Sequence, residues 1–383
     1  MFPSYEQQRE SRRVRGYAKP AAPDKPISAR VLANFGEAVA ASVIRSKPDE
    51  NTDAQISAGE FPIHSHGDSA LELEQASTFK AVPLKKLPLL VAGDIGHCEP
   101  VRNEQQQPSA ESINNDAGKP KGSGAIGDYR VTQLIQRSSA LARPDRRGQL
   151  KPVAANLSQL IIVCTPQPAP DRLLIDQFCV VAANQNIEPL IVLNKSDLLL
   201  DTSAADDSPG ADNSSGLSKA DGDKLLKPYA DAGFETLIMS SKTGDGMAQL
   251  RSALSRHTSV LVGQSGVGKS SIIKHILPDQ DIRVGAISAA TGLGAHTTTV
   301  SFFYALEGGG ALIDSPGVRQ FAVSYLEPSQ IMHGFPEIAR LASNCRFHNC
   351  IHRHEPDCAV LAALQDGQLD KTRYGNFCRL LDS

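Results

Sequence analysis

The stretch SVLVGQSGVGKSS, residues 259–271, decides the fold of this chain of 383 residues. Its apolar start predicts a buried strand, and the G-x-x-x-x-G-K-[ST] pattern that follows predicts a phosphate-binding loop opening a helix. Glycines let backbone N–H groups wrap phosphates beside the positive end of the helix dipole. Lys269 is expected to reach the β- and γ-phosphates, and Ser270 to ligate magnesium. The predicted phosphate-binding residues are Gly263, Gln264, Ser265, Gly266, Val267, Gly268, Lys269, Ser270 and Ser271.

Two other loops predict which base is bound. The tetrapeptide N-K-S-D at 194–197 follows the apolar run EPLIVL, and S-S-K at 240–242 follows TLIM. An aspartate at such a strand end accepts hydrogen bonds from the N1–H and 2-amino groups of guanine, which adenine cannot supply, so an ATP-dependent enzyme is disfavoured. The predicted guanine-binding residues are Asn194, Lys195, Ser196, Asp197, Ser240, Ser241 and Lys242.

Two more motifs complete a triphosphate site. The sequence D-S-P-G at 314–317 fits D-x-x-G, in which Asp314 would hold magnesium through water and the Gly317 amide would sense the γ-phosphate. The stretch GLGAHTTT at 292–299 lies between this motif and the phosphate loop. It offers three threonines, of which we expect Thr298 to coordinate magnesium.

The order of these motifs is unusual. An ordinary GTPase runs from the phosphate loop through D-x-x-G to N-K-x-D, whereas here the base-binding motifs come first. Strand-like and helix-like segments alternate from residue 151 to 324, which predicts a parallel sheet with helices on both faces. Its loops meet at the strands' carboxyl ends whatever their order, so we expect a circularly permuted α/β GTPase domain.

A cluster of cysteines near the C-terminus predicts a metal site. The pattern C-x4-C-x-H-x5-C supplies three thiolates and one imidazole, a closed set that suits one structural zinc ion per chain. We favour zinc over free cysteines and rank His348 and His354 as weaker rival ligands. The predicted zinc ligands are Cys345, Cys350, His352 and Cys358.

The rest of the chain predicts further domains. Short alternating strands between residues 28 and 150, interrupted by polar insertions near 46–77 and 103–126, predict a small β-barrel. We expect a flexible basic arm at 1–27, the GTPase domain at 151–324 with a polar insertion at 201–222, and a mainly helical domain at 325–383. Residues 127–152 carry six basic residues against two acidic ones, which favours contact with nucleic acid.

Composition excludes several classes of protein. Hydrophobic residues make up 40% of the chain and the net charge is -3, which argues against a disordered chain. No apolar run approaches the ~18–20 residues that cross a bilayer, and the N-terminus lacks the apolar core of a secretory signal. Seven cysteines, an odd number, argue against a fully paired disulfide framework. We therefore expect a cytoplasmic protein that does not bind membranes.

The whole set of motifs resembles the RsgA (YjeQ) family of circularly permuted GTPases that depend on the small ribosomal subunit. The resemblance covers about residues 150–383 and is weaker over 28–150, where the family has an OB-fold. It implies a monomer that binds the small ribosomal subunit and its rRNA, assists late maturation of the subunit, and hydrolyses GTP to GDP and phosphate with the subunit's stimulation. Mg²⁺ would accompany GTP.

The resemblance also implies a catalytic group. Val318 follows D-x-x-G where many GTPases have a glutamine that orients water, so we expect slow intrinsic hydrolysis. His296 of the H-T-T-T stretch is the substitute that the family suggests. The alternative function is a GTP-gated RNA-binding switch on the small subunit without a direct role in assembly.

Overall fold

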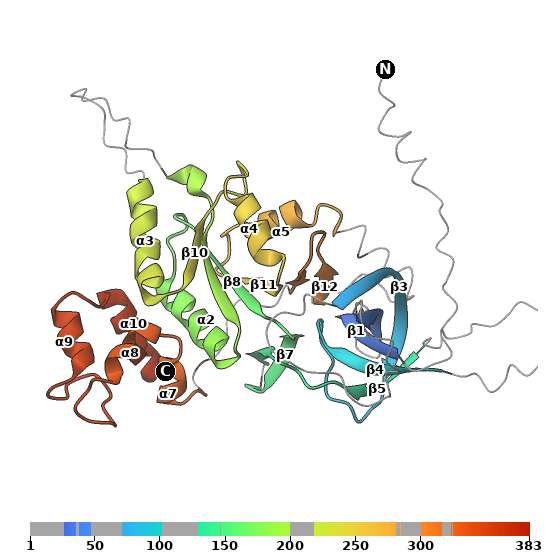
Figure 1. Ribbon diagram of the computed structural model, residues 1–383, viewed down its shortest axis with the longest axis horizontal. Coiled ribbons are helices and arrows are strands. Elements are labelled where there is room, and N and C mark those ends of the chain that lie inside the picture. The colour runs from blue at the N-terminus through green and yellow to red at the C-terminus, as the bar shows by residue number, and fades with distance from the viewer. Residues whose placement is uncertain are drawn as a thin grey trace, which may run out of the picture.

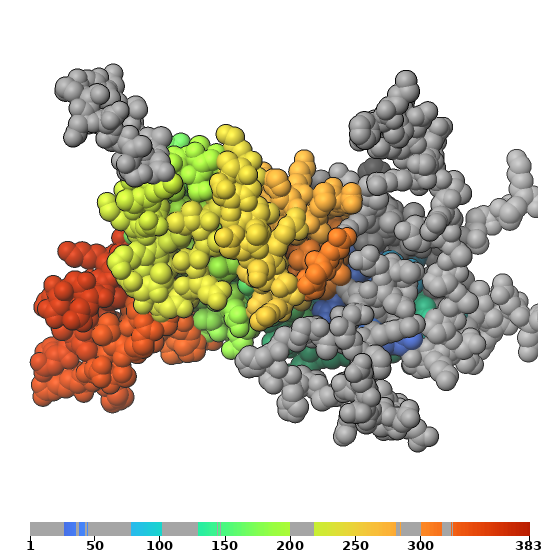
Figure 2. All heavy atoms as spheres, turned by 45° about the horizontal axis from the view of Figure 1, so that its top comes forward, coloured from blue at the N-terminus to red at the C-terminus, as the bar shows by residue number. Residues whose placement is uncertain are grey.

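The computed structural model describes residues 27–35, 38–46, 71–101, 129–145, 147–199, 218–280, 284, 300–315, 323 and 325–383. A β-barrel, a central α/β unit and a set of C-terminal helices follow one another along the molecule (Figure 1). Figure 2 shows the C-terminal helices, in red, packed directly on the central unit, whose orange segment lies at the opposite end. The predicted arm at 1–27 lies outside the described residues except for Ile27, which begins the first strand. Most of the polar insertions also lie outside them.

The N-terminal strands close into a barrel. Their order is β1-β2-β3-β5-β4, and β4 returns to pair with β1. The β3–β5 pairing is parallel, whereas the other pairings are antiparallel. Small and aromatic side chains fill the interior, where the rings of Phe79 and Tyr129 lie 4.5 Å apart. The predicted OB-like barrel is confirmed, and its strands are β1 (Ile27–Asn34), β2 (Val39–Ser46), β3 (Leu71–Pro83), β4 (Ile95–Pro100) and β5 (Tyr129–Leu134).

A separate hairpin connects the barrel to the central unit. Strands β6 (Ala140–Pro144) and β7 (Leu150–Ala155) pair with each other in an antiparallel sheet, and Ala154 of β7 also forms a parallel bridge with Ala92. The predicted domain boundary between residues 150 and 151 falls within β7. The division into domains stays a prediction.

The central sheet has the order β10-β9-β8-β11-β13-β12, parallel except for β12, which runs antiparallel to β13. Every residue of β8 and β11 is buried, as expected for strands covered on both faces. Ala33 of β1 pairs with Phe302 of β12, so barrel and sheet are continuous. The strands are β8 (Gln159–Cys164), β9 (Glu188–Leu193), β10 (Glu235–Ile238), β11 (Thr258–Val262), β12 (Phe302–Ala305) and β13 (Ala311–Asp314).

Helices cover both faces of this sheet. Alternate residues of β8 point to opposite sides: Ile162 packs with α2 (Arg172–Asn184) and α3 (Lys219–Ala232). Ile161 packs with the other pair, α4 (Met247–Leu254) and α5 (Lys269–Ile276). The predicted three-layer α/β arrangement is confirmed. Within the described parts of the chain, no helix combines the length and apolar character that a membrane span needs.

The C-terminal unit is helical, as predicted, and is fastened to α2 by a buried ionic network. Arg373 is 2% exposed and donates to Asp176 of α2 at 2.6 Å and to Glu337 at 2.7 Å. Its guanidinium lies over the rings of Tyr229, Phe234 and Phe335, at 4.6–5.4 Å from their centroids. The helices are α7 (Pro328–Met332), α8 (Pro336–Ala342), α9 (Ala359–Gln365) and α10 (Lys371–Leu381).

Replacing Arg373 by Met should loosen this attachment. It would leave Asp176 buried without its cationic partner, a loss that costs about 3–5 kcal/mol in other proteins. We expect faster amide hydrogen exchange in both α2 and α10. The matched control is Lys227→Met, which breaks the exposed pair of Lys227 and Asp231 at 3.0 Å and should change stability by about 1 kcal/mol or less. Equal effects of the two variants would contradict this account of the attachment.

Candidate nucleotide and metal sites

The predicted nucleotide-binding loops gather at one edge of the central sheet. Parallel strands β9, β8, β11 and β13 are neighbours or near neighbours, and their carboxyl ends face the same way. The phosphate loop follows β11, the N-K-S-D loop follows β9, and Asp314 ends β13. Ligands of open α/β sheets bind at this edge, so the topology provides one common site for motifs that are permuted along the chain.

The phosphate loop has a backbone that requires its glycines. Gly263, Gly266 and Gly268 have φ values of +136°, +83° and +94°. A Cβ atom on Gly263 would lie 2.2 Å from the Val163 carbonyl oxygen, and one on Gly268 would lie 2.4 Å from Asn194 Nδ2. Such contacts are too short for any side chain. The glycines therefore let the loop pass close to β8 and to the base-binding loop.

The first turn of α5 carries the polar groups of the phosphate site. Lys269 begins the helix, and its Nζ donates to the carbonyl oxygens of Gly263 and Gln264, both at 2.7 Å. The ammonium thus lies over the loop, as a phosphate-binding lysine must. Ser270 and Ser271 are exposed on the same turn, where the hydroxyl of Ser270 is open to a metal ion.

The Asn194 side chain connects its own N-K-S-D loop to the phosphate loop and to the S-S-K loop. It is fully buried; its Nδ2 donates to the Val267 carbonyl of the phosphate loop, and its Oδ1 accepts from the Ser241 amide, each at 2.9 Å. The side chain is satisfied within the protein, so its contribution is to fix the phosphate loop and the S-S-K loop relative to each other. Lys195, next to it, has φ of +61° and donates to the Gln167 carbonyl oxygen at 3.2 Å.

Asp197 is held in place as a charged acceptor. The Ser240 hydroxyl donates to its Oδ1 at 2.5 Å, and Lys242 Nζ lies 3.6 Å from its Oδ2. The hydrogen bond from Ser240 is the main cause that lowers the pKa of Asp197 below its usual value. A cavity of about 500 Å³ lies beside it, lined by Ser196, Asp197, Leu199, Lys219, Asp223, Ile238 and Asp245. An ionised carboxylate held in this way can accept hydrogen bonds from a purine edge.

Asp314 and Ser270 are the described members of the predicted magnesium site. Burial raises the pKa of the Asp314 carboxyl group, and the Gln280 side chain donates to its Oδ2 at 2.6 Å. The strands that precede Asp314 and the phosphate loop are paired in parallel, which directs the carboxylate and the Ser270 hydroxyl toward one edge. Oxygen donors of these kinds suit magnesium. His296, Thr298, Gly317 and Val318 lie outside the described residues.

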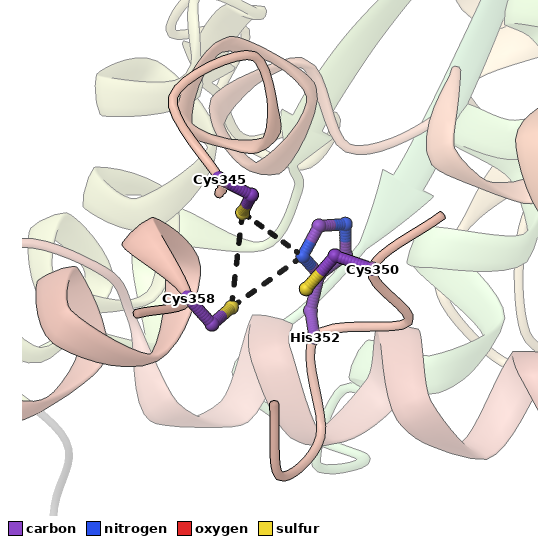
Figure 3. A group of neighbouring side chains, drawn as sticks. All are labelled: Cys345, Cys350, His352 and Cys358. Carbon is purple, nitrogen blue, oxygen red and sulfur yellow. Dashed lines mark hydrogen bonds between the residues drawn. The ribbon is translucent and has the colours of Figure 1, made fainter. Parts of the chain in front are cut away.

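The four predicted zinc ligands come together at the C-terminal unit (Figure 3). Their donor atoms all lie within 4.8 Å of one another. The sulfurs of Cys345 and Cys358 are 3.8 Å apart, and His352 Nδ1 is 3.6 Å from each of them. A tetrahedral ion with Zn–S bonds of ~2.3 Å and Zn–N bonds of ~2.05 Å has edges of about 3.8 and 3.6 Å. The cluster could therefore bind zinc, and His348 and His354 are not among its members.

The loop that carries His352 is shaped by neighbouring groups. Glu355 accepts hydrogen bonds from the backbone amides of Ile351, Arg353 and His354, which together lower its pKa to about 2. The Tyr374 hydroxyl of α10 donates to the His352 carbonyl oxygen at 2.8 Å. The metal cluster is thus linked to the same helix that Arg373 fastens to α2.

Two sets of residues near these sites escaped the sequence analysis. Gln280 belongs to no motif, and Arg373 and Asp176 are separated by 197 positions. A buried arginine gives no periodic or spacing signal, because its partners are set only by tertiary packing. The ionic network could be found only from the structure.

Known proteins that resemble this chain are GTPases, in agreement with the nucleotide-binding motifs of the site. The model of the RsgA GTPase family matches residues 134–324. A relative from Ectopseudomonas mendocina, named small ribosomal subunit biogenesis GTPase RsgA, is 44% identical over 68% of this chain and 71% of its own length. A relative of the same name from Saccharophagus degradans is 42% identical over 74% of this chain and 85% of its own.

The chain belongs to the RsgA GTPase family. It is a GTPase, and the resemblance inferred from its motifs is confirmed. Two solved structures share the fold of this RsgA family member. One is YjeQ from Thermotoga maritima, which has a TM-score of 0.62 and 22% sequence identity; the match covers 93% of this chain and 98% of YjeQ. The other is YloQ, described as a circularly permuted GTPase, with a TM-score of 0.59 at 20% identity over 96% and 97% of the two chains.

Proposed function

We propose that this GTPase binds the small ribosomal subunit, assists its late maturation, and hydrolyses GTP to GDP and phosphate when the subunit stimulates it. The observation that carries the proposal is the convergence of Asn194, Asp197, Ser240 and the phosphate loop at one sheet edge. The chain is also 42–44% identical to relatives named small ribosomal subunit biogenesis GTPases. We propose that it acts in the cytoplasm as a monomer.

The residues divide the work of binding GTP. Asp197 reads the guanine edge, with Lys195, Ser196 and the 240–242 loop around the base. The amides of residues 263–268 and the Lys269 ammonium bind the phosphates, since backbone N–H groups and a helix N-terminus favour anions. Ser270, Thr298 and, through water, Asp314 would hold Mg²⁺, and the Gly317 amide would contact the γ-phosphate. Magnesium supplies positive charge that offsets the charge developing on the phosphoryl group.

The barrel binds the ribosome, and the C-terminal unit is stabilised by a metal ion. The barrel and the exposed basic residues around Arg130 and Arg143 provide a surface for rRNA, because lysine and arginine neutralise phosphates. Cys345, Cys350, His352 and Cys358 hold one structural zinc ion per chain. This ion has no open position for substrate, so we assign it no role in hydrolysis.

Depletion of the protein separates the proposal from its alternative. If the GTPase assists assembly, ribosome profiles of depleted cells should show free small subunits with immature rRNA. A GTP-gated RNA-binding switch without a role in assembly would leave subunit maturation normal, and that result would overturn the proposed function.

We expect His296→Ala to separate hydrolysis from binding. Val318 cannot orient water, so an ordered 292–299 loop would have to bring the imidazole to the attacking water. Affinity for GTP should stay nearly unchanged, while most of the rate stimulated by small subunits is lost. Single-turnover hydrolysis with purified subunits measures this, with His275→Ala as the control because His275 is exposed on the outer side of α5. Full stimulation of the His296→Ala protein would remove His296 from the mechanism.

A further inference from the structure

The carboxylate of Asp314 has a specific partner, Gln280, four residues beyond the end of α5. Gln280 Nε2 donates to Asp314 Oδ2 at 2.6 Å, across 34 positions of sequence. The same nitrogen lies 3.4 Å from the Tyr304 hydroxyl of β12, a much longer contact. Among the residues that the structure describes, Gln280 supplies the side-chain hydrogen bond that Asp314 accepts.

The position of Gln280 is set by the packing of α5. Ile276 and Leu277 at the end of the helix are buried in the cluster that also contains Tyr304 and Leu312. Leu312 and Asp314 are two residues apart on β13 and therefore point to the same face of the sheet. The backbone N–H of Gln280 donates to the Leu277 carbonyl oxygen at 3.2 Å, which turns the chain back toward that face. The side chain is thereby directed to Asp314 by the fold.

The chemistry of an amide fits a carboxylate that must stay available to a cation. A lysine or arginine here would neutralise Asp314 and compete with the metal ion. A glutamine NH₂ group donates a hydrogen bond without adding charge, so the carboxylate keeps its full negative charge. The bond uses Oδ2, and a carboxylate has further lone pairs on its other oxygen for a water molecule of the metal.

We infer that Gln280 is a positioning residue for the magnesium site: it orients the Asp314 carboxylate toward the water shell of Mg²⁺ at the phosphate edge. The inference rests on the proposed role of Asp314. A substitution of Gln280 should therefore change the effect of magnesium on nucleotide binding and leave recognition of the base intact.

The test compares nucleotide affinity with and without magnesium. The full-length Gln280→Met protein keeps the length of the side chain and loses the donor. Affinities for GDP and for the non-hydrolysable analogue GppNHp are measured by calorimetry in EDTA and in saturating Mg²⁺. We expect the tightening caused by Mg²⁺ to fall about 10- to 150-fold, as for loss of a hydrogen bond to a charged group. Affinity in EDTA should stay within roughly twofold of wild type, because Asp314 then has no metal to hold.

Controls separate this inference from the function on which it rests. Tyr304→Phe removes the hydroxyl that lies near the Gln280 side-chain NH₂ group and should leave the effect of Mg²⁺ unchanged. Gln280→Ala repeats the test if the Met variant is poorly folded. If Mg²⁺ did not change the affinity of the wild-type protein for GppNHp, the proposed magnesium site itself would be refuted. A normal response to Mg²⁺ in the Gln280 variants, or an equal loss of affinity in EDTA, would overturn the inference alone.

Discussion

Replacing Asp197 by Asn should weaken GTP binding by about 2–4 kcal/mol, a loss of roughly 30- to several hundred-fold in affinity. The preference should move toward xanthine nucleotides, because an amide can donate to the 2-oxo group that replaces the amino group of guanine. The Ser240 hydroxyl would still hold the side chain in place at the edge of the cavity. Isothermal calorimetry with GDP and xanthosine diphosphate measures both changes.

The matched control is Asp223→Asn, which removes an exposed carboxylate that lines the same cavity. Asp223 has no assigned contact with the base, so the affinity of this variant for GDP should stay close to that of wild type. Unchanged GDP affinity in the Asp197→Asn protein would refute the guanine assignment.

Loss of a zinc ligand should have the largest effect on stability. Binding of a structural zinc ion contributes apparent free energies of about 10–16 kcal/mol in small zinc domains, where it is coupled to folding. Cys358 is buried, and its sulfur lies 3.8 Å from Cys345 and 3.6 Å from His352, so Cys358→Ser removes a corner of the tetrahedron. We expect bound zinc to fall and hydrogen exchange in α9 and α10 to rise.

The effect should also extend into the GTPase unit. Arg373 and Asn376 of α10 both donate to Asp176 of α2, so unfolding of the C-terminal helices would remove both of these partners from that carboxylate. The control is Cys378→Ser, a partly buried cysteine of α10 outside the cluster. Elemental analysis that finds no zinc in freshly purified, unchelated protein would contradict the assignment, as would normal exchange in the Cys358→Ser protein.

The motifs and their strand ends could be predicted from the sequence because each depends on local chemistry. Residues 263–270 need glycines at fixed positions, and the spacing from Cys345 to Cys358 suits a tetrahedral ion. The order of the motifs predicted the permutation, since a parallel sheet brings strand ends together in space. Alternating short strands predicted the barrel for a similar reason.

Long-range side-chain contacts could not be predicted. The bonds from Gln280 to Asp314 and from Arg373 to Asp176 depend on which helix face meets which strand, information that no short window of sequence carries. The pairing of Ala33 with Phe302, which joins the barrel to the sheet, likewise has no local signal. The contacts of Arg373 with Asp176 and of Ala33 with Phe302 join the C-terminal helices and the barrel to the central unit.

Single-turnover GTP hydrolysis with and without purified small ribosomal subunits tests the central claim most directly. Val318 in place of a water-orienting glutamine predicts slow hydrolysis by the free protein. Small subunits should accelerate the reaction strongly, and the acceleration should weaken as salt rises, because contacts with rRNA phosphates release counterions. Hydrolysis at the same rate with and without subunits, at every salt concentration, would contradict the account.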